Sequence, residues 1–180
     1  MPEVKTLGSR QVYENRWIRV REDRILFANG LEGIYGVIEK NNSSLIFPLT
    51  EDGFVYLVEQ WRYPVGRRYW ELPQGSWESD PSVDPLILAQ GELREETGLT
   101  ACEMDYVGEL FESYGLSNNR CHIFLAKGLT EGKANIESEE QGLICQKFAL
   151  NDAIKMVING EIQDAVTVAA FGLLRLKNLI

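Results

Sequence analysis

The sequence predicts an α+β or layered α/β sandwich, because strand-like and helix-like segments follow one another without the strict βαβ alternation of a doubly wound sheet. The chain of 180 residues is 44% hydrophobic and 25% charged, which is an ordinary globular composition. No internal repeat, low-complexity tract or Pro/Ser-rich linker divides it. We therefore expect one domain over residues 1–180, long enough to bury a sizeable core.

The N-terminal third favours antiparallel strands. Residues 12–27 mix β-branched and aromatic side chains with charged ones, and an Asn29–Gly30 turn separates them from an extended stretch over 33–39. This pattern predicts an N-terminal hairpin. Two further strands are expected over residues 45–49 and 54–60.

Helices with recognisable ends are predicted in the remainder. Residues 85–97 form one, with Asp84 as N-cap, proline at the first helical position and Gly98 as C-cap. Residues 165–176 form another, because their apolar side chains recur at helical spacing. Strands are expected over 106–111, 121–126 and 145–149, and Asn151 is expected to begin a capped helical segment through Val157.

Charge and cysteine content exclude several classes of protein. The 27 acidic residues outnumber the 18 basic ones, giving a formal net charge of −9 that repels nucleic acid and anionic membranes. The first residues lack the apolar core of a signal peptide, and no run approaches the roughly 18 apolar residues of a membrane helix. We expect a soluble, cytoplasmic protein whose three widely spaced cysteines are free thiols.

Glu92, Glu95 and Glu96 gather on one side of the first predicted helix. Their like charges would destabilise the helix by a few tenths of a kcal/mol per pair unless a divalent cation lay among them. Oxygen ligands alone select magnesium or manganese rather than zinc. Taken in isolation, the same cluster also fits an ordinary solvated acidic face.

The sequence around these glutamates resembles the Nudix box. An LPQG turn at 72–75 leads through a loop into GELREETGL at 91–99, in the glycine–loop–helix–loop order of that signature. Upstream, QWRYP at 60–64 and WELP at 70–73 resemble the ADP-ribose pyrophosphatase and nucleoside-diphosphate-sugar hydrolase branch of the Nudix hydrolases. The resemblance, from about residue 12 to 153, implies a Nudix α/β/α sandwich with a mixed central sheet and an extra N-terminal antiparallel hairpin.

The box, residues 75–99, departs from the family pattern in two places. Pro81 stands where a glutamate is usual, and the loop between Gly75 and the helix is two residues longer. Gly91 replaces the usual arginine, which removes a cationic partner and costs about 1 kcal/mol of helix propensity. Arg94 is a candidate surrogate for the missing cation.

The resemblance implies a metal site and a general base. Carried over by position, the metal ligands are Glu92 and Glu96, with Glu95 assisting, and the backbone carbonyl of Gln74. Mg²⁺, with Mn²⁺ as the alternative, would neutralise a pyrophosphate and lower the pKa of an attacking water. The base is expected on a late loop, where residues 137–142 are rich in acids. Glu140 is the first choice and Glu139 the second, with Glu95 as a further catalytic candidate and an ordinary acidic loop as the alternative.

Candidate substrate-binding residues come from several segments. Trp17 and Tyr13 are expected to stack on a nucleobase, although a strand tryptophan is as often part of a core. Arg62 and Arg67 are expected to contact phosphates or sugar. Ser117, in a polar turn before a strand, is a candidate for the sugar site.

These residues lead to a specific hypothesis: Mg²⁺-dependent hydrolysis of a nucleoside diphosphate sugar, such as ADP-ribose, ADP-glucose or GDP-mannose, to a nucleoside monophosphate and a sugar phosphate. Dinucleoside-polyphosphate or dinucleotide pyrophosphatase activity is one alternative, and a nucleotide-sugar sensor without turnover is another. The resembled branch also implies a homodimer that exchanges N-terminal strands, about residues 8–40, and shares a base site.

Overall fold

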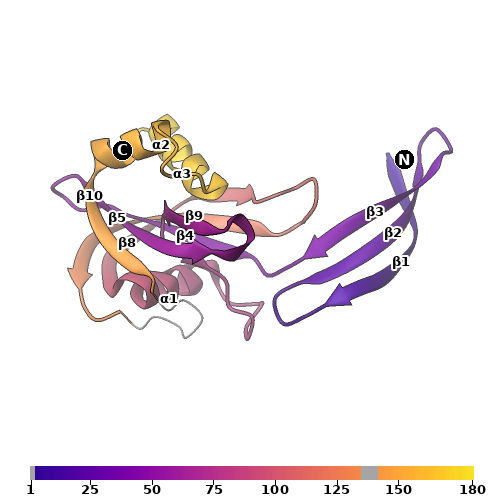
Figure 1. Ribbon diagram of the computed structural model, residues 1–180, viewed down its shortest axis with the longest axis horizontal. Coiled ribbons are helices and arrows are strands. Elements are labelled where there is room, and N and C mark those ends of the chain that lie inside the picture. Colours follow the sequence, from indigo (N-terminus) through magenta and orange to yellow (C-terminus); the bar gives the residue numbers. More distant parts are fainter. Residues whose placement is uncertain (1–2, 135–141) are drawn as a thin grey trace.

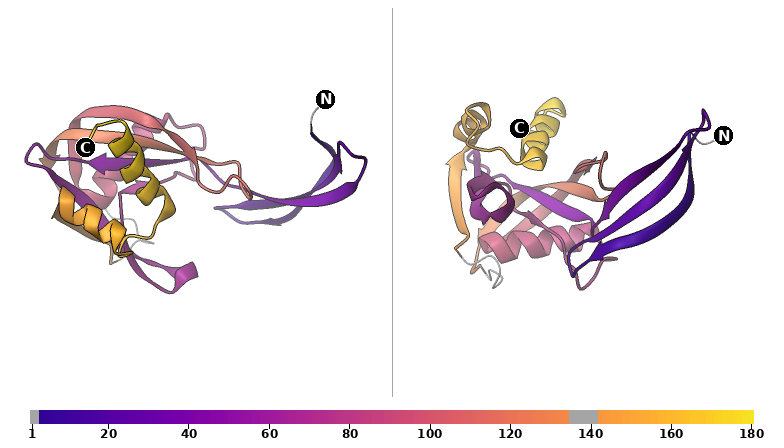
Figure 2. Two further views of the ribbon diagram at one scale, coloured as in Figure 1. Left: turned by 90° about the horizontal axis from the view of Figure 1, so that it is seen from above. Right: turned by 45° about the vertical axis from the view of Figure 1, so that its right-hand side comes forward.

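A computed structural model describes residues 3–134 and 142–180 of the protein. Its first part is a long antiparallel sheet that projects from the rest of the molecule (Figures 1 and 2). We call this sheet the arm; it consists of β1 (Val4–Glu14), β2 (Arg19–Phe27) and β3 (Glu32–Glu39) in the order β1-β2-β3. The predicted hairpin is confirmed in β2 and β3, and the additional strand β1 lies before it.

The rest of the described chain, residues 40–134 and 142–180, forms the body and is built on a mixed arrangement of strands. The strands are β4 (Ser43–Pro48), β5 (Phe54–Arg62), β6 (Arg67–Glu71), β7 (Gln74–Gly75), β8 (Leu99–Phe111), β9 (Arg120–Glu131) and β10 (Ile144–Ala149), with a 3₁₀ turn at Tyr63–Val65. They form sheets in the orders β7-β4-β9-β8 and β10-β5-β6. β4 pairs with β9 in parallel, whereas its other neighbour, β7, is antiparallel. The expected mixed sheet is therefore confirmed.

Helices cover opposite faces of these strands (Figure 1). They are α1 (Pro85–Thr97), α2 (Leu150–Ile158) and α3 (Ala165–Leu176). Because side chains alternate across a strand, Leu45 and Phe47 of β4 join the core beneath α2 and α3, while Ile46 joins the core beneath α1. This layering confirms the α/β/α sandwich. Among the described residues, no helix is long and apolar enough to cross a membrane.

The predicted ends of α1 are confirmed. The Asp84 side chain accepts a hydrogen bond from the Leu86 N–H at 2.8 Å, and Gly98 ends the helix with a left-handed φ of 75°. The predicted start of the next helix was wrong, because α2 begins at Leu150 with Ala149 as its N-cap. No side chain of the described residues caps this helix; the N–H of Leu150 instead donates to the Gly53 carbonyl at 3.0 Å.

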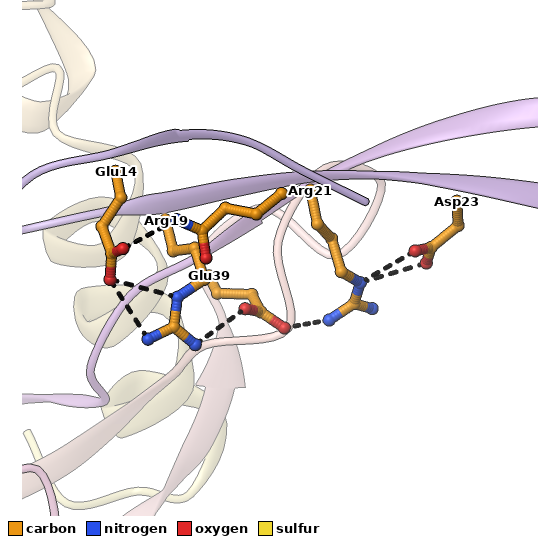
Figure 3. A network of polar contacts seen from close by, with 6 residues as sticks. Glu14, Arg19, Arg21, Asp23 and Glu39 are labelled. Atoms are coloured by element: carbon orange, nitrogen blue, oxygen red, sulfur yellow. Dashed lines mark hydrogen bonds and ion pairs between the residues drawn. The ribbon is translucent and has the colours of Figure 1, made fainter. Parts of the chain in front are cut away.

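The arm is held together along one side by charged pairs (Figure 3). Arg19 lies 3.3 Å from Glu14 and 3.6 Å from Glu39, and Arg21 bridges Glu39 and Asp23. β1 is exposed along its whole length. Cross-strand ion pairs thus join the strands where the arm has little core of its own.

Candidate active site

A cleft of about 600 Å³ opens in the body, a size that suits a small-molecule ligand. Its walls come from β4 to β7, from the residue after β8 and from the start of α3. The polar lining residues are Lys40, Ser43, Arg62, Tyr69, Glu71, Gln74, Ser76, Glu112, Gln163 and Asp164. Residues distant in sequence therefore converge on one concave surface.

The predicted metal ligands lie together directly behind one wall of this cleft. Glu92 and Glu96 are 6% and 1% exposed, and their carboxylates lie against β7. The N–H of Gln74 donates to Glu96 Oε2 at 3.0 Å. A Cβ added to Gly75 would meet Glu92 Oε1 at 2.7 Å and Cδ at 2.6 Å, so only glycine lets the backbone approach that carboxylate. Glu95 is half-buried on the same helix.

This donor set suits a hard divalent cation. Two carboxylates buried one helical turn apart repel each other, and a cation between them would relieve that repulsion. Within residues 3–134 and 142–180, no group of three His, Cys, Asp or Glu side chains could hold a metal ion. A cation bound by Glu92 and Glu96 would therefore also need oxygens from the backbone, water or substrate.

A second polar group, which sequence reasoning did not assign, lies in the cleft around Glu71. Arg62 Nη2 donates to Glu71 Oε1 at 2.5 Å. Gln74 Nε2 donates to Glu71 Oε2 at 3.3 Å and to Asp164 Oδ2 at 3.1 Å. Burial raises the pKa of Glu71, and the nearby Arg62 charge lowers it only in part. The WELP segment contained this glutamate, but only the tertiary structure shows that it holds Arg62.

A third polar group lies around Glu112 and connects Lys40, where the arm meets the cleft, to Ser43 of β4. Glu112 accepts hydrogen bonds from Ser43 Oγ at 2.6 Å and Lys40 Nζ at 3.0 Å. Burial favours a raised pKa for Glu112, but the hydrogen bond from Ser43 and the Lys40 charge hold this pKa below its ordinary value. Glu112 is therefore an ionised wall of the cleft that fixes a lysine at its edge.

Of the predicted substrate residues in the body, Arg62 lines the cleft. Arg67 is exposed and stacks over the Tyr69 ring, with its guanidinium carbon 4.8 Å from the ring centre. Ser117 is buried where it forms an isolated parallel bridge to Ile38 of β3, and its hydroxyl donates to Asn119 Oδ1 at 2.7 Å. The structure thus brings Arg62 to the candidate site and places Ser117 in the support of a neighbouring loop.

The two aromatic candidates lie on the arm. Trp17 is 48% exposed and lines a hollow of about 210 Å³, with the Arg16 guanidinium 4.5 Å over its ring; Tyr13 is 53% exposed on β1. Lys40 lines both this hollow and the cleft, so the two are neighbours. Glu139 and Glu140, the predicted bases, lie outside the described residues.

Two models of known protein families match the sequence of this chain. Residues 40–171 match the family model of the NUDIX domain, and residues 4–38 match that of the nucleoside diphosphate sugar hydrolase N-terminal domain. The chain belongs to the Nudix family. The boundary between the matches falls where the arm joins the body of this Nudix hydrolase.

Individual relatives of this Nudix hydrolase are similar to it along nearly the whole chain. It is 28% identical to an ADP-ribose pyrophosphatase of Bacillus subtilis (strain 168), covering 99% of this chain and 96% of that protein. It is 26% identical to a methanol dehydrogenase activator of Bacillus methanolicus, again covering 99% and 96%. A crystal structure of an ADP compounds hydrolase shares the fold with a TM-score of 0.85 at 20% identity, covering 97% of this chain and 94% of that one.

Proposed function

We propose that this Nudix hydrolase cleaves the pyrophosphate bond of a nucleoside diphosphate sugar, releasing a nucleoside monophosphate and a sugar phosphate. The observation that carries the proposal is the pair of buried carboxylates, Glu92 and Glu96, packed behind the Gln74–Gly75 wall of a cleft that also presents Arg62 and Lys40. The N-terminal family match and the ADP-ribose pyrophosphatase relative support this substrate class.

The residues of the cleft have distinct roles in the proposed reaction. Glu92 and Glu96, with the Gln74 carbonyl and Glu95 in support, would hold Mg²⁺, or Mn²⁺ in its place. When bound, the cation supplies charge neutralisation of the diphosphate and a more acidic water. Arg62 and Lys40 bind phosphate oxygens at the mouth of the cleft.

Neighbouring side chains orient the positively charged groups of Arg62 and Lys40 and limit the access of water to them. Glu71 holds the guanidinium of Arg62 in place, and Glu112 does the same for Lys40. Tyr69 presents an aromatic wall to the ligand. Glu140, with Glu139 as second choice, takes the proton from the attacking water in this proposal.

The arm suits two further tasks, base recognition and pairing of subunits. Its exposed apolar side chains include Val4, Val12, Tyr13, Ile34 and Tyr35. A second copy that covered this surface would protect the edge strand β1 and bring Trp17 toward a nucleobase. The proposed state is therefore a homodimer, which sedimentation at micromolar concentration should detect. A fully active monomer at nanomolar concentration would contradict both the pairing and a role for Trp17 across the interface.

The cysteines bear on the proposed location of the enzyme. Cys102, Cys121 and Cys145 are free thiols, and burial raises the pKa of Cys121 to about 12 and that of Cys145 to about 11. Free thiols fit a reducing compartment such as the cytoplasm.

A hydrolysis screen tests the proposal. ADP-ribose, ADP-glucose, GDP-mannose, UDP-glucose and a dinucleoside polyphosphate are incubated with the protein and Mg²⁺, and products are separated by ion-exchange chromatography. We expect at least one nucleotide sugar to yield a nucleoside monophosphate, and the Glu96→Gln variant to yield none. Preferred cleavage of the dinucleoside polyphosphate would favour the alternative substrate class. Saturable binding without turnover would favour a sensor.

A further inference from the structure

The loop that begins at β7 contacts α1 at successive positions. The Gln74 N–H binds Glu96, and the Gly75 backbone lies against Glu92. Two residues later, the indole of Trp77 lies against Gly91. The loop and the helix therefore run side by side, and Trp77 occupies the position next to a proposed metal ligand.

Gly91 is required by the position of this indole. A Cβ at Gly91 would lie 2.9 Å from Trp77 Cη2 and 3.3 Å from Cε2, and closer still to Cζ2. These are atoms of a rigid ring, so they cannot move independently as the end of a flexible side chain could. The absence of the usual arginine therefore has a structural reason: Trp77 fills the space that any larger residue at position 91 would need.

Trp77 is also tied to the junction between arm and body. Its carbonyl accepts a hydrogen bond from Asn41 Nδ2 at 3.0 Å. On either side of Asn41, Lys40 binds Glu112 at 3.0 Å and the Asn42 side chain accepts from the Arg120 N–H at 2.9 Å. Three consecutive junction residues thus each bind a different segment of the body.

We propose that Trp77 is a positioning residue. Its ring packs against Gly91, and its carbonyl is hydrogen-bonded to Asn41 at the arm junction. Trp77 thereby fixes the Gln74–Gly75 backbone against the two buried glutamates and so sets the affinity for the metal ion. This inference rests on the proposed function, because it takes Glu92 and Glu96 as the metal ligands. It goes further by assigning a role to an extended loop and a box glycine in which this chain departs from its family.

Metal binding measured without substrate tests this role directly. The dissociation constant for Mn²⁺ is determined by electron paramagnetic resonance for the wild type, Trp77→Ala, Trp77→Phe and Gly91→Ala. Substituting a residue that orients a metal ligand typically lowers metal affinity by about 10- to 100-fold. We therefore expect Trp77→Ala and Gly91→Ala each to weaken Mn²⁺ binding by ~10-fold. Trp77→Phe, which keeps an aromatic ring at the contact, should retain most of the affinity.

A double variant and a matched glycine separate positioning from simple packing. In Trp77→Ala/Gly91→Ala the clash is absent, so its Mn²⁺ affinity should be no worse than that of Trp77→Ala alone. Gly172→Ala in α3 is the control, because nothing lies within 4 Å of its added Cβ. It should raise the melting temperature and leave Mn²⁺ affinity unchanged.

The possible outcomes are distinguishable. If Trp77→Ala lowers only the melting temperature and leaves Mn²⁺ affinity at the wild-type value, Trp77 merely packs and the inference is overturned. Additive losses in the double variant would also overturn it, because the two residues would then act independently. Failure of the proposed function is separate: the wild type would bind Mn²⁺ through Glu96 yet hydrolyse no nucleotide sugar.

Discussion

The backbone N–H of Gln74 and Oε2 of Glu96 are joined by a hydrogen bond of 3.0 Å, which connects β7 to the last turn of α1. A hydrogen bond to a carboxylate is stronger than one between neutral groups. The contact therefore fixes a proposed metal ligand against the wall of the cleft.

Glu96→Gln should abolish turnover without unfolding the protein. Glutamine has nearly the same shape and still accepts the Gln74 N–H, while one of two like charges on the helix is removed. Stability in metal-free buffer should be unchanged or slightly higher. At a Mg²⁺ concentration 100 times its dissociation constant, the wild type should gain about 2.7 kcal/mol and the variant should not, which thermal melting can measure. Wild-type activity in the variant would refute the ligand assignment.

Ser43→Ala and Ser44→Ala should differ in the pH dependence of their stability losses. Ser43 donates to the ionised Glu112, whereas Ser44 donates to the neutral carbonyl of Pro85 at 2.9 Å. The lowered pKa of Glu112 gives stability that is present above the ordinary value of 4.5 and lost as pH falls through the folded value. Ser43→Ala should thus cost about 1.5 kcal/mol at pH 7 and less at pH 3, while the Ser44→Ala loss stays constant in urea denaturation.

Arg62→Met should destabilise the protein in a manner that depends on the ionisation of Glu71. The raised pKa of Glu71 means that stability is full below the ordinary value of 4.5 and falls as pH rises through the folded value. Without Arg62 this fall should deepen, by about 1–2 kcal/mol at pH 8 after allowing for the 41% exposure of the arginine side chain.

The double variant Arg62→Met/Glu71→Gln separates the ion pair from substrate binding. Because the buried charge is gone, stability at pH 8 should return toward the wild-type value. KM should remain raised, since no guanidinium is left to bind phosphate. Recovery of both quantities would show that Arg62 serves only to neutralise Glu71.

Alanine at two left-handed glycines should have unequal effects. Gly53, with φ of 80°, has nothing within 4 Å of an added Cβ, so Gly53→Ala should cost about 1 kcal/mol from backbone strain alone. Gly98, with φ of 75°, would bring its Cβ to 2.7 Å from the Ala134 nitrogen. Gly98→Ala should cost about 2–3 kcal/mol in urea denaturation, because overpacking adds to the strain.

Glu140→Gln should lower kcat by a factor on the order of 10² to 10⁴ with little change in KM, since a general base acts on the chemical step. Steady-state kinetics measure both quantities, and Glu139→Gln is the adjacent control. A larger effect at Glu139 would shift the base by one residue. If neither change mattered, the base would have to be sought at Glu95, Glu112 or Glu137.

Local signals in the sequence were sufficient for the elements that contain the Nudix box. Asp84, Pro85 and Gly98 determine where α1 begins and ends through a side-chain cap, a fixed φ and a left-handed residue, all of which are local properties. The spacing of Glu92 and Glu96 placed both carboxylates on one helix face. Strands and helices could be told apart because the periodicities of their hydrophobic residues differ, and the order of these elements predicted the layered fold.

Tertiary structure alone decided which distant residues meet. Glu71 and Asp164 are 93 positions apart, yet both accept hydrogen bonds from Gln74 because β7 ends beside the start of α3. Gly91 lowers the helix propensity of α1, and only the tertiary structure shows that the Trp77 ring occupies the space beside it. Periodicity and capping act over a few residues, whereas strand pairing and helix packing set contacts across the whole chain, so the sequence determined the box and the fold determined the cleft around it.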